Sequence, residues 1–133
     1  MSIFRFIRWI AEGEPIQLFG DGLQARDFTY VDDIARGTIA GLKPLGYEII
    51  NLGGGRPVSL RWIIQQLEAY LGKPARWIQQ PMHPADVHAT WAEITKARTL
   101  LGWEPQIRIE EGLKRSVDWY LQNRSWAKEI VLP

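Results

Sequence analysis

Glycine and proline residues divide this sequence into short segments, and the spacing of apolar residues changes from helical to strand-like between neighbouring segments. Near the N-terminus, four apolar residues share one helical face: Ile3, Phe6, Ile7 and Ile10. After Gly13 and Pro15, an apolar run over 16–19 has the length of a strand, and a glycine-rich turn follows at 20–22. Short helices and strands in alternation predict a small mixed α/β domain.

The rest of the chain continues this alternation. We expect helices over about 32–42, 60–71, 93–101 and 110–123, an extended segment over 26–30, and strands over 47–52 and 76–80, the first of them buried. An irregular, proline-rich loop is expected at 81–86. Ser59 is placed to cap the helix that follows it. The glycines at 53–55 predict a loop whose backbone takes left-handed angles or closely approaches another group.

The length of 133 residues, with 46% hydrophobic and 23% charged residues, predicts a single compact domain over 1–133. The formal net charge is +1 and charges of both signs are spread along the chain, so we expect no nucleic-acid-binding face and no membrane-binding polybasic run. No apolar run is long enough to cross a bilayer, and arginines near the N-terminus disfavour a secretory signal. The absence of cysteine fits a reducing compartment, and we expect a cytoplasmic protein.

The sequence lacks the patterns that a self-sufficient enzyme would show. None of its tyrosines is followed four residues later by lysine, and no Gly-x-Gly-x-x-Gly or P-loop motif is present. The two histidines, His83 and His88, are five residues apart, which places them on different faces of a helix or strand. We therefore expect no catalytic residue, no cofactor-binding residue and no metal site in this chain.

Residues 19–33, which read FGDGLQARDFTYVDD, resemble the extended short-chain dehydrogenase/reductase family of NAD-dependent sugar-nucleotide epimerases and dehydratases. Three further matches follow in the family's order: NLGGG at 51–55, PADV at 84–87 and GWEP at 102–105. The resemblance covers nearly the whole chain. It is strongest to the UDP-glucuronate 4-epimerases, with UDP-glucuronate decarboxylases and dTDP-glucose 4,6-dehydratases as near relatives.

The resemblance implies a division of labour. Family enzymes have an N-terminal Rossmann domain, which holds NAD and carries the catalytic Tyr-x-x-x-Lys, and a smaller C-terminal domain, which grips the nucleotide diphosphate. This chain resembles the second part, so the Rossmann domain and NAD are expected to lie outside it and Met1 to lie inside a longer chain. The expected ligand is a UDP-sugar, which the chain would anchor while the sugar reacts elsewhere.

Five residues match substrate-binding positions of the family. Arg26 matches an arginine that contacts the diphosphate, a role suited to a guanidinium; the alternative is an ion pair with Asp27 or Asp33. Gln17 and Phe19 match a strand whose backbone pairs with the edge of uracil, although a plain buried strand fits equally well.

Asp86 matches an acid that accepts hydrogen bonds from ribose hydroxyls, with a loop-bracing role as the alternative. His83 departs from the family, which often has Arg or Gln there to reach the phosphate or ribose. A neutral imidazole is a weaker phosphate ligand, and it gains charge only as the pH falls toward its pKa.

Other charged residues have structural interpretations. Asp32 and Asp33 are expected to satisfy free backbone N–H groups at a helix start, and Arg56 is an exposed loop arginine that would at most extend an anion site. Whether the chain is part of an enzyme stays open. It is either the nucleotide-sugar-binding part of an epimerase that is inactive alone, an interaction module that self-associates or binds a partner through its exposed inter-domain face, or a subunit complemented in trans by a Rossmann domain.

Overall fold

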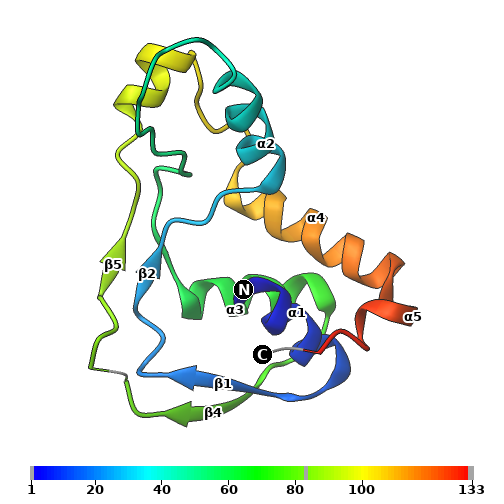
Figure 1. Cartoon of the computed structure of the whole chain (residues 1–133). Coiled ribbons are helices and arrows are strands. Elements are labelled where there is room, and N and C mark those ends of the chain that lie inside the picture. The colour runs from blue at the N-terminus through cyan, green and yellow to red at the C-terminus, as the bar shows by residue number, and fades with distance from the viewer. Residues whose placement is uncertain (1, 83, 132–133) are drawn as a thin grey trace. The chain divides into compact units, whose positions relative to one another are not determined.

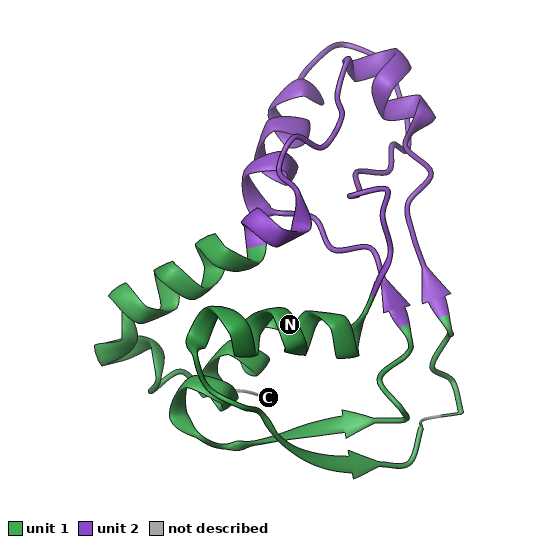
Figure 2. Ribbon diagram, turned by 180° about the vertical axis from the view of Figure 1, so that it is seen from behind, with its two compact units in different colours: residues 1–24, 59–88, 113–133 green, residues 25–58, 89–112 purple. Residues whose placement is uncertain are grey.

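The structure is a computed structural model that describes residues 2–82 and 84–131. Its helices are α1 (Ser2–Glu12), α2 (Val31–Ala40), α3 (Leu60–Leu71), the π-helical turn η1 (Ala97–Leu101), α4 (Ile109–Gln122) and α5 (Arg124–Ala127) (Figure 1). Its strands are β1 (Pro15–Phe19), β2 (Ala25–Arg26), β3 (Val58–Ser59), β4 (Arg76–Gln80) and β5 (Ala89–Thr90). The elements divide into two compact units: unit 1 comprises residues 1–24, 59–88 and 113–133, and unit 2 comprises residues 25–58 and 89–112 (Figure 2).

Unit 1 is built on a two-stranded parallel sheet in which β1 pairs with β4, Pro15 opposite Arg76 and Phe19 opposite Gln80. Side chains of β1 alternate between the two faces, so Ile16 and Leu18 are buried whereas Gln17 and Phe19 are exposed. The core of the unit also contains residues of α1, α3 and α4: Ile7, Ile10, Ile63, Ile64, Leu67, Leu113, Val117 and Tyr120.

Helix α3 forms as its sequence predicts. Ser59 caps it, since the Ser59 hydroxyl oxygen accepts a hydrogen bond from the Trp62 backbone N–H at 3.2 Å. Ile63, Ile64 and Leu67, which share one face of the helix, are buried in the core of unit 1. The helix ends at Gly72, whose left-handed conformation, with a φ of 63°, suits a residue without a side chain.

Unit 2 has a smaller apolar core. Its buried cluster consists of Ile94, Ala97 and Trp103, with four half-buried residues packed around it: Ile50, Leu52, Ala92 and Leu101. Strand β2 pairs in parallel with β5, Ala25 opposite Ala89 and Arg26 opposite Thr90, and β3 lies on the other side of β2.

The prediction of a buried strand over 47–52 is wrong. The segment forms no strand among the described residues, and the side chains of Tyr47 and Ile49 are 90% and 69% exposed. Only Ile50 and Leu52 reach the core of unit 2. An apolar segment becomes a buried strand only when a neighbouring strand pairs with its backbone, and the described part of the chain supplies none.

Three further boundaries differ from expectation. Of the extended segment predicted over 26–30, only Arg26 belongs to a strand, β2. The helix predicted over 93–101 begins at residue 95 and continues as the π-helical turn η1. Short helix α5 was not predicted, because its four residues follow α4 after a single intervening residue. The other predicted helices and the strands at 16–19 and 76–80 are confirmed to within two residues.

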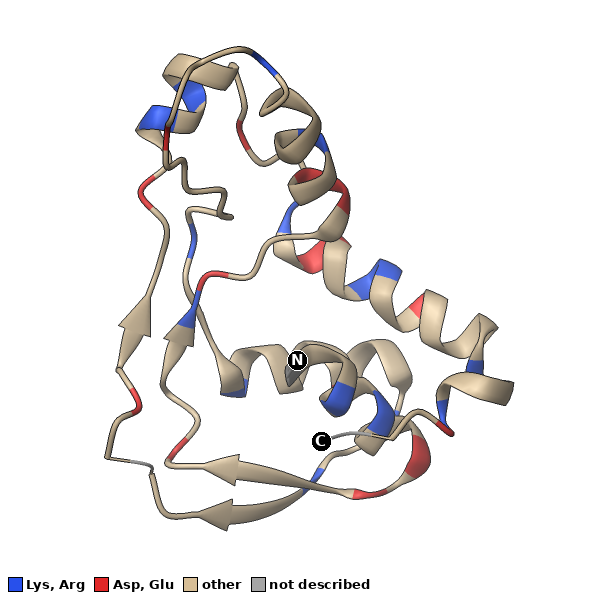
Figure 3. Ribbon diagram, in the orientation of Figure 1, with Lys and Arg blue, Asp and Glu red and all other residues tan. Residues whose placement is uncertain are grey.

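Charged residues are mixed along both units. Figure 3 shows Lys and Arg interspersed with Asp and Glu on the ribbons of each unit. Among the helices that the structure describes, none is both long enough and apolar enough to span a bilayer.

Candidate functional site

The exposed edge of β1 is the place where Gln17 and Phe19 lie. The Gly20 N–H donates to the Gln80 carbonyl at 2.9 Å, so alternate residues of this strand direct their backbone groups toward β4. Gln17 and Phe19, at the intervening positions, direct theirs toward the opposite edge. Within the described residues, β4 is the only strand that pairs with β1, so this edge of the sheet carries no further strand.

Two glutamine side chains, those of Gln24 and Gln80, donate hydrogen bonds to residues of this strand. Gln24 is buried, and its Nε2 donates to the Phe19 carbonyl at 2.7 Å. The Gln80 Nε2 donates to the Gln17 Oε1 at 2.9 Å, on the sheet face where the Phe19 ring is exposed. The Phe19 carbonyl therefore already accepts a hydrogen bond within the chain, and the hydrogen bond from Gln80 orients the side-chain amide of Gln17.

Arg26 lies on β2 in unit 2, half-buried, and its Nη1 donates to the Ala25 carbonyl at 2.7 Å. Both carboxylates that the sequence offers as ion-pair partners accept backbone hydrogen bonds. The Asp27 Oδ2 accepts from the N–H groups of Gly55 and Ala92, at 3.0 Å and 3.1 Å. Asp33 is held by Arg36.

Asp86 lies in the loop before β5. Asp86 is half-buried in unit 1, together with Gln17 and Phe19, whereas Arg26 belongs to unit 2. His83 lies outside the described residues.

Asp33 is a scaffold residue, but its partners differ from those expected. It is fully buried, and its carboxylate accepts backbone hydrogen bonds from Gln106 at 3.1 Å and Ile107 at 2.9 Å, not from the first turn of its own helix. Burial acts to raise its pKa, but the hydrogen bonds from Arg36, Ile107 and Gln106 outweigh burial, and the pKa is lowered. Asp33 therefore joins residues 106–107 to α2.

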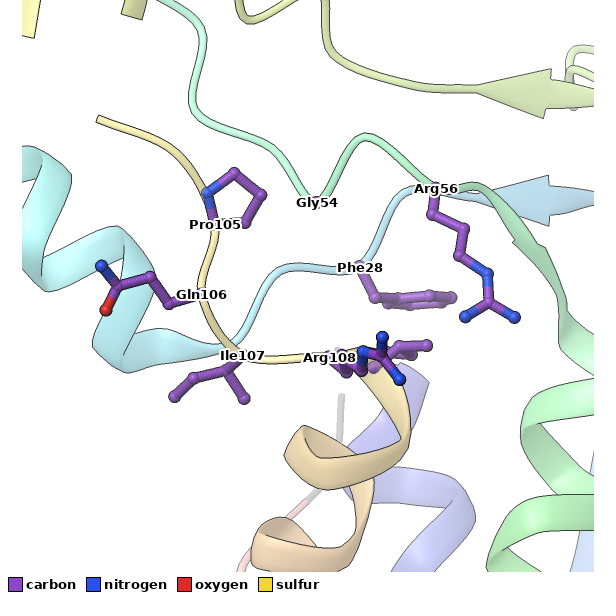
Figure 4. A pocket seen from close by; sticks show the side chains of 8 residues that line it. Phe28, Gly54, Arg56, Pro105, Gln106, Ile107 and Arg108 are labelled. Atoms are coloured by element: carbon purple, nitrogen blue, oxygen red, sulfur yellow. The ribbon is translucent and has the colours of Figure 1, made fainter. Parts of the chain in front are cut away.

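A pocket of about 380 Å³ lies within unit 2 (Figure 4). It is lined by Phe28, Gly54, Arg56 and residues 105–109. The Arg56 Nη1 donates to the Glu110 Oε1 at 2.9 Å, and the guanidinium groups of Arg56 and Arg108 lie near the Phe28 ring (Figure 4). The sequence singles out Arg56 beside the triple glycine, but no local pattern reveals that Arg108, 52 residues later, lies beside the same pocket.

The described residues contain no group of three or more His, Cys, Asp or Glu side chains arranged to hold a metal ion.

A family model described as GDP-mannose 4,6 dehydratase matches residues 1–116 of the chain. The chain belongs to this epimerase/dehydratase family. The family resemblance of the 19–33 segment and of the motifs that follow it is thus confirmed.

Within this family, the chain is 63% identical, over 98% of its length, to UDP-glucuronate 4-epimerase of Thermodesulfobacterium geofontis. It also matches the solved structure of UDP-glucuronic acid 4-epimerase from Bacillus cereus in complex with UDP-glucuronic acid and NAD, with 40% identity over 92% of the chain and a TM-score of 0.85. An epimerase from Methanothermobacter thermautotrophicus matches over 97% of the chain with 32% identity and a TM-score of 0.90.

The chain spans only part of these family members. It covers 41% of the length of the Thermodesulfobacterium protein, 40% of the Bacillus cereus structure and 39% of the Methanothermobacter structure. The small mixed α/β fold of the chain is therefore one part of a larger epimerase fold.

Proposed function

We propose that this chain is the nucleotide-sugar-binding part of an NAD-dependent UDP-sugar 4-epimerase, with UDP-glucuronate as the substrate class. The observation that carries the proposal is the 63% identity to a UDP-glucuronate 4-epimerase over nearly the whole chain. In this proposal the chain corresponds to the smaller, C-terminal part of the fold and is inactive alone, because its sequence has no Tyr-x-x-x-Lys pair.

Each substrate-binding residue has a chemical role in this proposal. The outward backbone groups of Gln17 and Phe19 meet the edge of the uracil ring. No described strand occupies this edge of β1, and the Phe19 carbonyl, which accepts from Gln24, has a second lone pair for the ligand. Arg26 binds the diphosphate through charge-assisted hydrogen bonds. Asp86 accepts hydrogen bonds from the ribose, with His83 nearby in sequence as a weaker phosphate ligand than the arginine or glutamine that often occupies its position.

Two glycines of the 53–55 loop pack against other segments of the chain. A Cβ atom added to Gly53 would lie 2.3 Å from the Ala92 Cβ, and one added to Gly54 would lie 2.6 Å from the Phe28 carbonyl oxygen. Gly53 and Gly54 thus allow protein segments to pack closely. The sequence also has no Gly-x-Gly-x-x-Gly motif for a dinucleotide. We place the NAD site, and the hydride transfer that NAD carries out, outside this chain.

Anchoring the nucleotide is a substantial contribution to such a reaction. Binding energy from the non-reacting UDP group holds the sugar in position, and well-oriented reactants react far faster than freely diffusing ones. The proposed role of the chain is therefore to fix the diphosphate and the uracil while the rest of the enzyme acts on the sugar C4.

Calorimetric titration of the chain with UDP and UDP-glucuronate tests the proposal, with NAD as the negative control. We expect saturable UDP binding of roughly millimolar strength, about 4 kcal/mol, that is lost in Arg26→Ala. Arg98→Ala is the matched control, because Arg98 is an exposed arginine of the same unit that pairs with Glu104 at 3.7 Å. Equal UDP binding by Arg26→Ala and the unaltered chain would show that the diphosphate site is assigned wrongly.

A second candidate is an interaction module that binds a Rossmann subunit in trans or a second copy of itself. Exposed apolar residues of unit 2 favour it, since Leu42, Tyr47 and Ile49 are all largely exposed. Mixing the chain with a separately produced Rossmann part of a family member and assaying UDP-glucuronate epimerisation tests the first form. Sedimentation velocity tests the second form. Activity in the mixture alone would establish the trans arrangement, whereas a monomeric chain that leaves the Rossmann part inactive would exclude both forms.

A further inference from the structure

The pocket lined by Phe28, Arg56 and Arg108 contains none of the described residues assigned to UDP, namely Gln17, Phe19, Arg26 and Asp86. We propose that it binds a second ligand, a small organic anion whose phosphate or carboxylate lies between Arg56 and Arg108 and whose flat ring lies against Phe28. Its volume of about 380 Å³ falls in the range of pockets that hold small molecules, roughly 300–1,000 Å³.

The charges around the pocket favour an anion. The residues that line it include two arginines, Arg56 and Arg108, and no acid, while the carboxylate of Glu110 pairs with Arg56 from outside the lining. A hydrogen bond from its own backbone N–H lowers the pKa of Glu110, burial opposes this, and Arg56 and the charge of Arg108 lower it further. The carboxylate therefore stays ionised at neutral pH and competes with any incoming anion for Arg56.

This competition is weak enough for a ligand to win. The side chains of Arg56 and Glu110 are 63% and 36% exposed, and solvent-exposed ion pairs contribute little to stability. A phosphate or carboxylate that contacts two guanidinium groups at once gains charge-assisted hydrogen bonds from both. Arg108 is exposed and lines the same pocket as Arg56.

The backbone holds Arg56 in place. Asp27 accepts a hydrogen bond from the N–H of Gly55, the residue immediately before Arg56. Gly54 lies so close to the Phe28 carbonyl that no side chain fits there. The loop and the Phe28 wall are thus fixed relative to each other, which reduces the entropy lost when a ligand binds.

The wall of the pocket selects for a ring. The Phe28 ring is half-buried and lies beside the two guanidinium groups, with Ile107 and Ile109 also in the lining (Figure 4). A flat ring stacked on Phe28 adds apolar contact to the charge interaction. Aromatic or heterocyclic phosphates and carboxylates are therefore preferred over inorganic phosphate.

Titration calorimetry with phenyl phosphate, benzoate and inorganic phosphate tests this proposal on the unaltered chain. We expect saturable binding of phenyl phosphate or benzoate, at least several-fold tighter than that of inorganic phosphate. The stronger of the two organic probes identifies the anionic group that the pocket prefers. Failure of both to bind a chain whose circular dichroism shows it folded would overturn the proposal.

Variants then assign the binding to this pocket. Arg108→Ala is expected to weaken binding of the stronger probe by about tenfold or more, and Glu110→Gln to tighten it several-fold, because the competing carboxylate is removed. Arg98→Ala, the matched control, is expected to leave it unchanged. Weaker binding in Glu110→Gln, or an equal loss in Arg98→Ala and Arg108→Ala, would contradict the assignment.

The two sites are separated by Arg26→Ala. This variant is expected to lose UDP binding yet keep the affinity of the chain for phenyl phosphate. Loss of phenyl phosphate binding in Arg26→Ala would show that UDP and phenyl phosphate bind at one site, and it would overturn the proposal of a second site. Failure of UDP to bind the unaltered chain would contradict only the proposed function.

Discussion

Two aspartates of unit 2 hold distant segments of the chain together through hydrogen bonds. Asp27 joins β2 to the triple-glycine loop and to Ala92, and Asp33 joins α2 to the segment before α4. Their hydrogen bonds connect residues between 28 and 74 positions apart in the sequence. A buried carboxylate that accepts several backbone N–H groups holds segments whose own apolar contacts are few.

Replacement of Asp33 tests this role. Asp33→Asn keeps one acceptor oxygen but turns an amide group toward backbone N–H donors, so we expect the free energy of unfolding to fall by about 1–3 kcal/mol. Urea denaturation followed by circular dichroism measures the change. Asp32→Asn, at the exposed neighbouring position, is expected to change it by no more than about 0.5 kcal/mol. Equal losses in the two variants would mean that the contacts of Asp33 are not what stabilises the protein.

At the scale of elements, one carboxylate holds three helices of unit 1 together. Glu12, at the end of α1, binds the Arg124 guanidinium of α5 at 2.8 Å and 2.9 Å and accepts a hydrogen bond from the Tyr120 hydroxyl of α4 at 2.9 Å. The hydrogen bonds from Arg124, opposed by burial and supplemented by Tyr120, lower the pKa of Glu12 to about 2. Burial, followed by the hydrogen bond to Glu12, raises the pKa of Tyr120.

This lowered pKa predicts how stability depends on pH. An unfolded chain protonates Glu12 near pH 4.5 but the folded chain only near pH 2, so the unfolded state binds more protons between these values. The stabilisation is therefore fully present above about pH 4.5 and is lost as the pH falls toward 2. Urea denaturation at a series of pH values from about 7 down to about 2.5 measures this effect. As the pH falls, the free energy of unfolding should decrease less for Glu12→Gln than for the unaltered chain. For Glu129→Gln, which removes an exposed carboxylate, the free energy of unfolding should decrease with falling pH as it does for the unaltered chain. Identical pH profiles for all three proteins would show that Glu12 does not cause the pH dependence.

The sequence predicts those elements whose backbone hydrogen bonds form within the element itself. The capped, amphipathic α3 and the helix after Pro105 follow from spacing and punctuation, because a helix satisfies its own backbone hydrogen bonds. Segment 47–52 has the composition of a strand but lacks a partner strand within the described chain, and partner availability is not a local property. The same limit applies to the sites: the motif residues are visible in the sequence, whereas the pairing of Arg56 with Glu110 is a tertiary contact.

At the scale of the whole molecule, the two units differ in what stabilises them. Of the ten largest fully buried side chains among the described residues, nine belong to unit 1, and the tenth is the charged Asp33 of unit 2. Unit 2 instead relies on a cluster of three buried residues and on the two aspartates. Several of its apolar side chains, including Leu42, Tyr47 and Ile49, remain largely exposed.

This difference predicts that unit 2 opens before unit 1. Burial of apolar surface is the main favourable contribution to folding, so the unit that buries less opens at a lower free-energy cost. Hydrogen exchange measured by mass spectrometry should show faster exchange in peptides from α2 and η1 than in peptides from α3. If the exposed apolar residues of unit 2 are where a Rossmann part docks, adding that part should slow exchange over 42–52 while α3, as the internal reference, stays unchanged. Equal protection of α2 and α3 in the isolated chain would show instead that the two units open as one.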